Sequence, residues 1–287
     1  MTSTASDSAS AAFSENCIVC GGTRSKRCSA CASNGCEWMY FCSIEHQRLI
    51  WPAHKRVCGI EAVPFHWPLF TKSEAAEAKS SLSSRPSPEE PGSISFTGLI
   101  SSDGRSFVTD EQLVAEVDKA TQGSSLLVTD LELRYIKAAF LRRQSFRLKL
   151  SEQTSSTTQT FDNIPMMMAV IAQDPFGALA KFVRDYNSLF PLEFVKGPHG
   201  LIDSLLHKTL AHFALLAAYY KDPSTLSDLR PLLEHTKAEV LRYCREELVV
   251  SKPAVAEWFQ QDLVHSFTRD TFLPLGAATD QQTVWKP

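Results

Sequence analysis

The feature that most constrains this chain is a run of cysteine and histidine residues close to its N-terminus. Within residues 17–58 the pattern is Cys-x2-Cys-x7-Cys-x2-Cys-x10-Cys-x3-His-x7-His-x3-Cys. The eight side chains of this pattern are Cys17, Cys20, Cys28, Cys31, Cys42, His46, His54 and Cys58. Two tetrahedral Zn²⁺ sites need eight nitrogen or sulfur ligands, so the run predicts a small domain built around two zinc ions.

The spacing within each pair suits a shared metal ion. A Cys-x2-Cys turn brings two thiolates within about 4 Å of each other, which fits Zn–S bonds of about 2.3 Å. Side chains four residues apart, such as Cys42 and His46, lie one helical turn apart on the same face. The segment is too short to bury a useful core, so metal binding must supply much of its folding free energy.

A disulfide framework is the alternative use of the same cysteines. Residues 1–12 have no basic residue and no apolar stretch, so they do not resemble a signal peptide. In a reducing compartment closely spaced cysteines are metal ligands. We therefore expect zinc ligands in an intracellular protein of the nucleus or cytoplasm, not disulfides in a secreted one.

The second half of the run resembles the MYND-type zinc finger, in which Tyr/Phe-Cys-Ser precedes Cys-Gln, Trp, His and a last Cys. Here the chain reads Phe41-Cys42-Ser43-Ile44-Glu45-His46-Gln47-x3-Trp51-x2-His54-x3-Cys58. The intervals over 17–31 and 42–58 match the family, and the resemblance ends at residue 58. The arrangement of such a finger followed by a helical region resembles fungal-type proteins in which the helical domain is uncharacterised.

The resemblance implies a cross-brace topology, in which the first and third pairs hold one zinc and the second and fourth pairs hold the other. The first site would contain Cys17, Cys20, Cys42 and His46. The second site would contain Cys28, Cys31, His54 and Cys58.

Two departures from the family pattern concern the first site. His46 stands where the family usually has cysteine, and imidazole is an ordinary zinc ligand. The segment between Cys31 and Cys42 is longer than usual and carries a further cysteine, Cys36. Cys36 could replace His46 as a ligand, but it would break the helical register of the pair, so we assign His46.

The family binds proteins, with short proline-rich peptides as the characterised targets. Three family positions that contact such peptides correspond here to Ser29, Gln47 and Trp51. An indole is a good apolar platform for a pre-extended proline-rich peptide. The alternative role of Trp51 is to cover the second zinc.

Nucleic acid is the competing partner for a zinc finger. Residues 13–60 hold six Lys/Arg and three Glu, a net charge of +3 in a chain of net charge −3. That charge is small for duplex binding, and the spacing lacks the helix-in-groove layout of Cys2His2 fingers. We expect a protein partner and no nucleic acid. The longest uncharged apolar run, residues 213–220, is too short to cross a membrane.

Beyond the finger the sequence predicts a mainly α protein. Residues 79–93 hold six Ser and three Pro, a composition typical of a linker. From residue 109 onward apolar residues recur at spacings of three and four. The division is a disordered N-terminus (1–12), the finger (13–60), a linker (61–108), a multi-helix domain (109–275) and a C-terminal tail (276–287).

Within that helical region we predict separate helices, and residues 94–108 could form a strand or hairpin. The segment 200–220 is the most apolar and is expected to be the central helix. One predicted helix starts at Thr109 or Asp110, a second starts at Asp130, and a third starts near Leu179 and stops at Pro191. The remaining predicted helices cover residues 200–220, 229–250 and 254–272.

Little in the helical region predicts catalysis. MYND fingers also occur in SET-domain lysine methyltransferases, whose cofactor site uses Asn-His and Gly-Glu-Glu-Leu. Residues 245–248 read Arg-Glu-Glu-Leu, and the chain has no Asn-His dipeptide. We therefore expect a non-enzymatic adaptor with a role in transcriptional regulation. A methyltransferase relative, or a helical domain with an unrecognised small-molecule activity, is the alternative.

Overall fold

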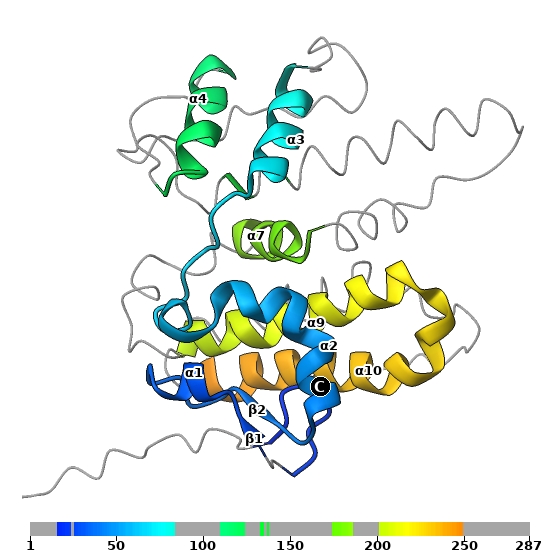
Figure 1. Ribbon diagram of the computed structural model, residues 1–287. Coiled ribbons are helices and arrows are strands. Elements are labelled where there is room, and N and C mark those ends of the chain that lie inside the picture. The colour runs from blue at the N-terminus through cyan, green and yellow to red at the C-terminus, as the bar shows by residue number, and fades with distance from the viewer. Residues whose placement is uncertain are drawn as a thin grey trace, which may run out of the picture.

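The protein is mainly helical, as the sequence predicts (Figure 1). This computed structural model describes residues 16–23, 26–83, 110–123, 133, 134, 137, 174–185 and 201–248. Within these residues the structure has one sheet, which consists of two short antiparallel strands. Predictions for residues 1–12, 94–108, 254–272 and 276–287 lie outside the described part of the chain.

The finger combines one small sheet with short helices. Strand β1 pairs with β2, with Lys26 opposite Phe41 and Arg27 opposite Tyr40. Its elements are β1 (Lys26–Arg27), α1 (Ser29–Ala32), β2 (Tyr40–Phe41), α2 (Ile44–His54), and the 3₁₀ turns η1 (Lys55–Val57) and η2 (Gly59–Glu61).

The central helix of the structure is α9 (Leu201–Lys221), which matches the apolar segment predicted at 200–220. The 3₁₀ turn η3 (Pro223–Thr225) reverses the chain into α10 (Leu226–Tyr243). The end of α10 passes into a π-helical turn, η4 (Cys244–Leu248). Helix α7 (Pro175–Asp185) also packs on α9. Cys244, at the start of η4, is fully buried.

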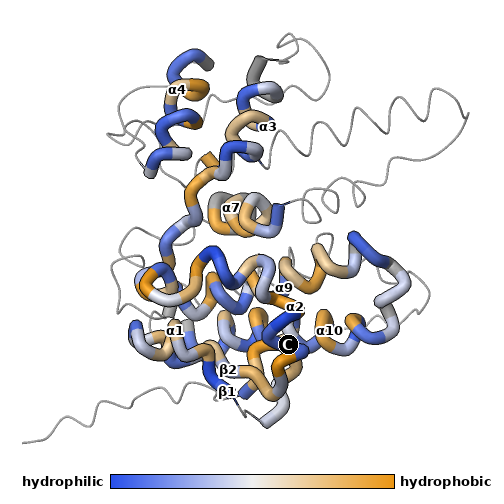
Figure 2. The backbone as a smooth tube through the Cα atoms, in the orientation of Figure 1, coloured by the Kyte–Doolittle hydropathy of each residue, from blue (hydrophilic) through white to orange (hydrophobic). Residues whose placement is uncertain are grey.

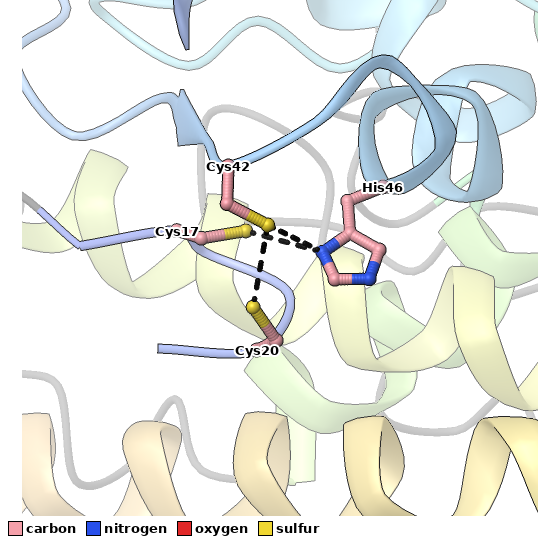
Figure 3. Close-up of side chains that lie close together, drawn as sticks. All are labelled: Cys17, Cys20, Cys42 and His46. Carbon is pink, nitrogen blue, oxygen red and sulfur yellow. Dashed lines mark hydrogen bonds between the residues drawn. The ribbon is translucent and has the colours of Figure 1, made fainter. Parts of the chain in front are cut away.

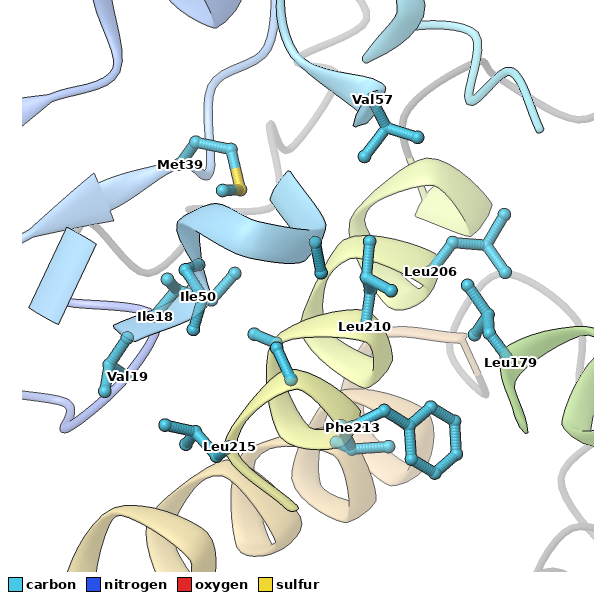
Figure 4. Packing of buried hydrophobic residues seen from close by; sticks show 14 of the residues in the cluster. Ile18, Val19, Met39, Ile50, Val57, Leu179, Leu206, Leu210, Phe213 and Leu215 are labelled. Carbon is cyan, nitrogen blue, oxygen red and sulfur yellow. The ribbon is translucent and has the colours of Figure 1, made fainter. Parts of the chain in front are cut away.

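The finger and the helices share one hydrophobic core (Figure 4). Finger residues Ile18, Met39 and Ile50 belong to the same buried cluster as Leu210 and Leu215 of α9. Helix α2 lies directly against α9. The sequence led us to expect a finger attached through a linker, and the structure adds direct packing between the finger and the helical part.

A second, smaller core forms between α3 (Lys72–Ser83) and α4 (Asp110–Ala120), above α7 in Figure 1. Helix α4 begins at one of the two predicted residues, and it alternates hydrophobic and hydrophilic positions (Figure 2). Helix α3 was not predicted, since it falls inside the range 61–108. The buried members of this core are Phe70, Ala75, Ala78, Leu113, Val117, Ala120 and Leu133.

A buried charge cluster ties the second core to the finger. The carboxylate of Glu74 on α3 lies 3.2 Å from Arg56 of the finger and 3.1 Å from Arg134. Lys137 lies 3.4 Å from the same carboxylate and 3.6 Å from Asp174 before α7. Because buried charges must be paired, these contacts position α3 relative to η1 and α7. No helix in the described residues has both the length and the apolarity to span a bilayer.

Candidate metal centres

The first predicted zinc site is present as a cluster of four side chains, Cys17, Cys20, Cys42 and His46 (Figure 3). The Cys20 and Cys42 sulfur atoms are 3.6 Å apart. Nδ1 of His46 lies 3.1 Å from the Cys42 sulfur and 3.6 Å from the Cys17 sulfur. The potential ligand atoms of the cluster all lie within 4.8 Å of one another.

Local backbone structure places these four side chains. The N–H of Gly21 donates to the carbonyl of Cys17 at 2.8 Å, which closes the tight turn between the first two cysteines. Gly21 has a φ of +68°, a conformation that glycine adopts without strain. At the other pair, the hydroxyl of Ser43 caps α2 by accepting from the N–H of His46. This cap sets the start of the helix so that Cys42 and His46 face the same point.

The second predicted site is also assembled, from Cys28, Cys31, His54 and Cys58. The Cys58 sulfur lies 3.5 Å from that of Cys28 and 3.7 Å from that of Cys31. Nε2 of His54 lies 3.4 Å from the Cys28 sulfur and 3.5 Å from the Cys31 sulfur. Cys28 immediately precedes α1 and His54 ends α2, so two helix ends meet at this site.

The geometry of both clusters fits Zn²⁺. In a tetrahedral site, Zn–S bonds of about 2.3 Å place two ligand sulfur atoms about 3.8 Å apart. The observed sulfur–sulfur distances of 3.5 to 3.7 Å are close to that edge length. Each site offers three thiols and one imidazole, a ligand set typical of structural zinc. The first and third pairs share one site and the second and fourth share the other, so the cross-brace arrangement is confirmed.

In each site the surroundings raise the pKa of at least one ligand thiol and so favour its protonated form. Burial, followed by the neighbouring Cys20 thiol, raises the pKa of Cys42 to about 12. Burial and the thiol of Cys28 also raise the pKa of Cys58. Zinc binds thiolates, so loading each site must release protons, and affinity must fall as the pH falls.

Cys36 takes no part in the first site. Its side chain is fully buried and contacts the thiol of Cys31, a residue of the second site. The structure therefore places His46 in the first cluster, as assigned from its helical spacing, and Cys36 outside both groups of four. The backbone N–H of Cys36 donates a hydrogen bond to the carbonyl of Cys31, which keeps Cys36 beside the second site.

The three residues aligned with peptide contacts lie on the outside of the finger. Ser29 is exposed at the start of α1, and Gln47 is half-buried on α2. Trp51 follows Gln47 by one helical turn and is 42% exposed. Its ring also makes an edge-on contact with the His54 ring, with centroids 5.8 Å apart. Trp51 therefore shields a zinc ligand and keeps an accessible face.

Sequence reasoning missed the residues of α9 that support the finger. The buried carboxylate of Asp203 accepts from the N–H of Phe65 at 2.8 Å. Nε2 of His207 lies 3.1 Å from the carbonyl oxygen of Ala62, and burial lowers the pKa of His207 to about 3. The available signal was the presence of polar residues on the most apolar helix, because buried polar groups need partners.

Comparison with known proteins agrees with this geometry. Residues 17–58 match the family model of the MYND finger. No curated protein and no solved structure matches the chain. The matched range begins and ends at the outermost ligands of the two sites. This segment is a zinc-binding finger of the class that mediates protein–protein interaction.

Proposed function

Because residues 17–58 form a MYND finger, we propose that this protein is a non-enzymatic adaptor whose finger docks a proline-rich segment of a partner protein. The observation that carries the proposal is the accessible indole of Trp51 on α2, which is 42% exposed despite lying beside a zinc ligand. A role in transcriptional regulation, in the nucleus or the cytoplasm, belongs to the same proposal.

The physical case rests on what this face offers to a peptide. A proline-rich segment is already extended in solution, so it loses little conformational entropy when it binds. The exposed face of Trp51 offers apolar area to proline rings, and Gln47 offers an amide for the peptide backbone. Because Gln47 and Trp51 are four residues apart on α2, they share one face of the helix.

The charges of the finger favour a protein partner over nucleic acid. Among the described basic residues of the finger, Arg27 and Arg56 are engaged within the protein. Arg27 donates to the carbonyl of Cys36 and lies over the ring of Tyr40. Arg56 pairs with Glu74, so neither side chain is a free phosphate ligand.

The helical part supports an adaptor more than a methyltransferase. Residues 245–248, which resemble a cofactor segment of SET enzymes, lie in the π-helical turn at the end of α10. The carboxylates of Glu246 and Glu247 lie 2.8 and 3.3 Å from Arg242. These acidic groups stabilise the end of α10. Binding of S-adenosylmethionine, measured by calorimetry, would overturn the adaptor proposal.

The docking face is tested by titrating zinc-loaded protein with a short synthetic peptide that contains consecutive prolines, while recording ¹H–¹⁵N spectra. We expect the Trp51 indole signal to shift, and we expect Trp51→Ala to weaken binding at least tenfold, as for an aromatic anchor. Leu69→Ala is the matched control, because Leu69 is an apolar side chain of similar exposure, 48%, outside the finger. No shift at millimolar peptide, or equal weakening in both variants, would contradict the proposal.

A further inference from the structure

One nitrogen of the zinc ligand His54 faces away from its site. Nε2 points to the sulfur atoms of Cys28 and Cys31, so it is the metal-binding nitrogen. The other nitrogen, Nδ1, is buried and has no hydrogen-bond partner among the described residues. A histidine bound to zinc almost always donates its second N–H to an acceptor, which fixes the ring and strengthens the ligand. An acceptor for His54 is therefore required inside the protein.

A suitable acceptor comes from outside the finger, on α9. His207 is 2% exposed, and its Nε2 lies 3.1 Å from the carbonyl oxygen of Ala62. A carbonyl oxygen can only accept, so the proton of the neutral imidazole must be on Nε2. Nδ1 of His207 is then left with a lone pair that can accept a hydrogen bond.

Both histidines lie beside one small cavity. Their ring centroids are 6.1 Å apart with the rings inclined at 65°, which is too far for a direct hydrogen bond and suitable for one bridging molecule. Both rings line a cavity of about 10 Å³. This is close to the smallest volume that holds one water. The other lining residues are apolar: Met39, Ile50, Ala53, Leu210 and Ala211.

We propose that one buried water occupies this cavity, accepts a hydrogen bond from Nδ1 of His54 and donates one to Nδ1 of His207. His207 is then a positioning residue for the second zinc, held on a helix more than 140 residues away in sequence. The bridge gives a partner to the Nδ1 donor of His54, which is buried and has no other partner among the described residues. It also makes the metal site depend on the packing of the finger against α9.

The first test measures zinc affinity by competition with a chromophoric chelator. In His207→Leu we expect the affinity of one of the two zinc ions to fall 10- to 100-fold, the range found when an outer partner of a ligand is removed. His212→Leu is the matched control, because His212 is another fully buried histidine of α9 that bonds Thr236 of α10 and does not line the cavity. His207→Gln retains a donor and an acceptor and should recover most of the affinity.

The second test observes the bridge directly in the wild-type protein, so it does not depend on any variant folding. Long-range ¹H–¹⁵N spectra of the zinc-loaded protein should show the Nδ1–H proton of His54, with a nuclear Overhauser contact to a bound water. The contact should disappear in His207→Leu with both zinc ions bound. The absence of a water contact at that proton in the wild type, or equal zinc affinity in His207→Leu and His212→Leu, would overturn the proposal.

Discussion

The close approach of the first zinc turn to α10 gives a prediction with a measurable magnitude. A Cβ atom added at Gly21 would lie 2.4 Å from Cε1 and 3.0 Å from Nδ1 of the His235 ring. Real Cβ atoms do not approach a neighbour so closely, so Gly21→Ala must displace either the turn or the imidazole. The substitution therefore probes the packing of the finger against the helical part at one defined point.

Two costs add in Gly21→Ala. Alanine at a φ of +68° costs about 1 to 2 kcal/mol relative to glycine. Relieving the contact with half-buried His235 adds about 1 to 3 kcal/mol, as for other overpacked sites. We expect a loss of about 2 to 5 kcal/mol in the free energy of unfolding. Gly35→Ala separates the two costs, because Gly35 has a φ of +79° and no atom within 4 Å of its added Cβ.

The assay is urea denaturation of the zinc-loaded proteins, with zinc content checked for each variant. His235→Ala removes the obstructing ring. In that background Gly21→Ala should therefore lose only the free energy of the unfavourable backbone conformation, without the added cost of the steric contact. The expected coupling energy between Gly21→Ala and His235→Ala is about 1 to 3 kcal/mol. If the two substitutions are additive within about 0.5 kcal/mol, or if Gly21→Ala costs no more than Gly35→Ala, the proposed contact does not exist in solution.

Three further predictions concern charge, burial and zinc content. Burial by itself raises the pKa of Glu239, but the hydrogen bond from Arg242 and the charge of Lys208 bring it down to about 2, below the ordinary glutamate pKa of 4.5. The carboxylate thus contributes up to about 3 kcal/mol of stability above pH 4.5, which is lost as the pH falls from 4.5 towards 2. Glu239→Gln should flatten this part of the stability profile, and an unchanged profile would contradict the assignment. Asp203→Ala leaves a buried backbone N–H unpaired and should cost about 1 to 3 kcal/mol in urea denaturation, whereas a change below about 0.5 kcal/mol would refute that contact. Cys36→Ser should retain two zinc ions in native mass spectrometry, and the loss of one would show that Cys36 is a ligand.

The sequence was most informative where chemistry fixes spacing. The four ligand pairs predicted two zinc ions, because two tetrahedral ions need eight Cys or His ligands, and the resemblance to the MYND finger implied how the pairs divide between the two sites. His46 was identified from its helical register with Cys42, and Ser43, which caps the helix, lies between them. Helix α9 was predicted as the central helix because residues 200–220 are the most apolar segment of a region in which apolar residues recur at spacings of three and four.

Contacts between distant segments could not be predicted in this way. Helix α3 buries only small side chains such as Ala75 and Ala78, which give a weak periodic signal. The ion pairs of Glu74 with Arg56, Arg134 and Lys137 form only when the chain folds, so the sequence around α3 does not show them. Judged by composition alone, this region resembles a linker. The pairing of the finger with α9 likewise depends on tertiary structure that local patterns do not contain.

The central claim is that a two-zinc finger and the helical part form one cooperative core. Structural zinc contributes about 10 to 16 kcal/mol at neutral pH in isolated fingers, comparable to the whole stability of a domain. Removing zinc should therefore unfold the finger and expose the face of α9 that packs against it. Hydrogen exchange of the full chain, with and without a chelator, tests this directly. We predict that amides of α9 around Leu210 and Leu215 lose at least hundredfold protection when zinc is removed. Unchanged protection of α9 in the zinc-free protein would contradict the account.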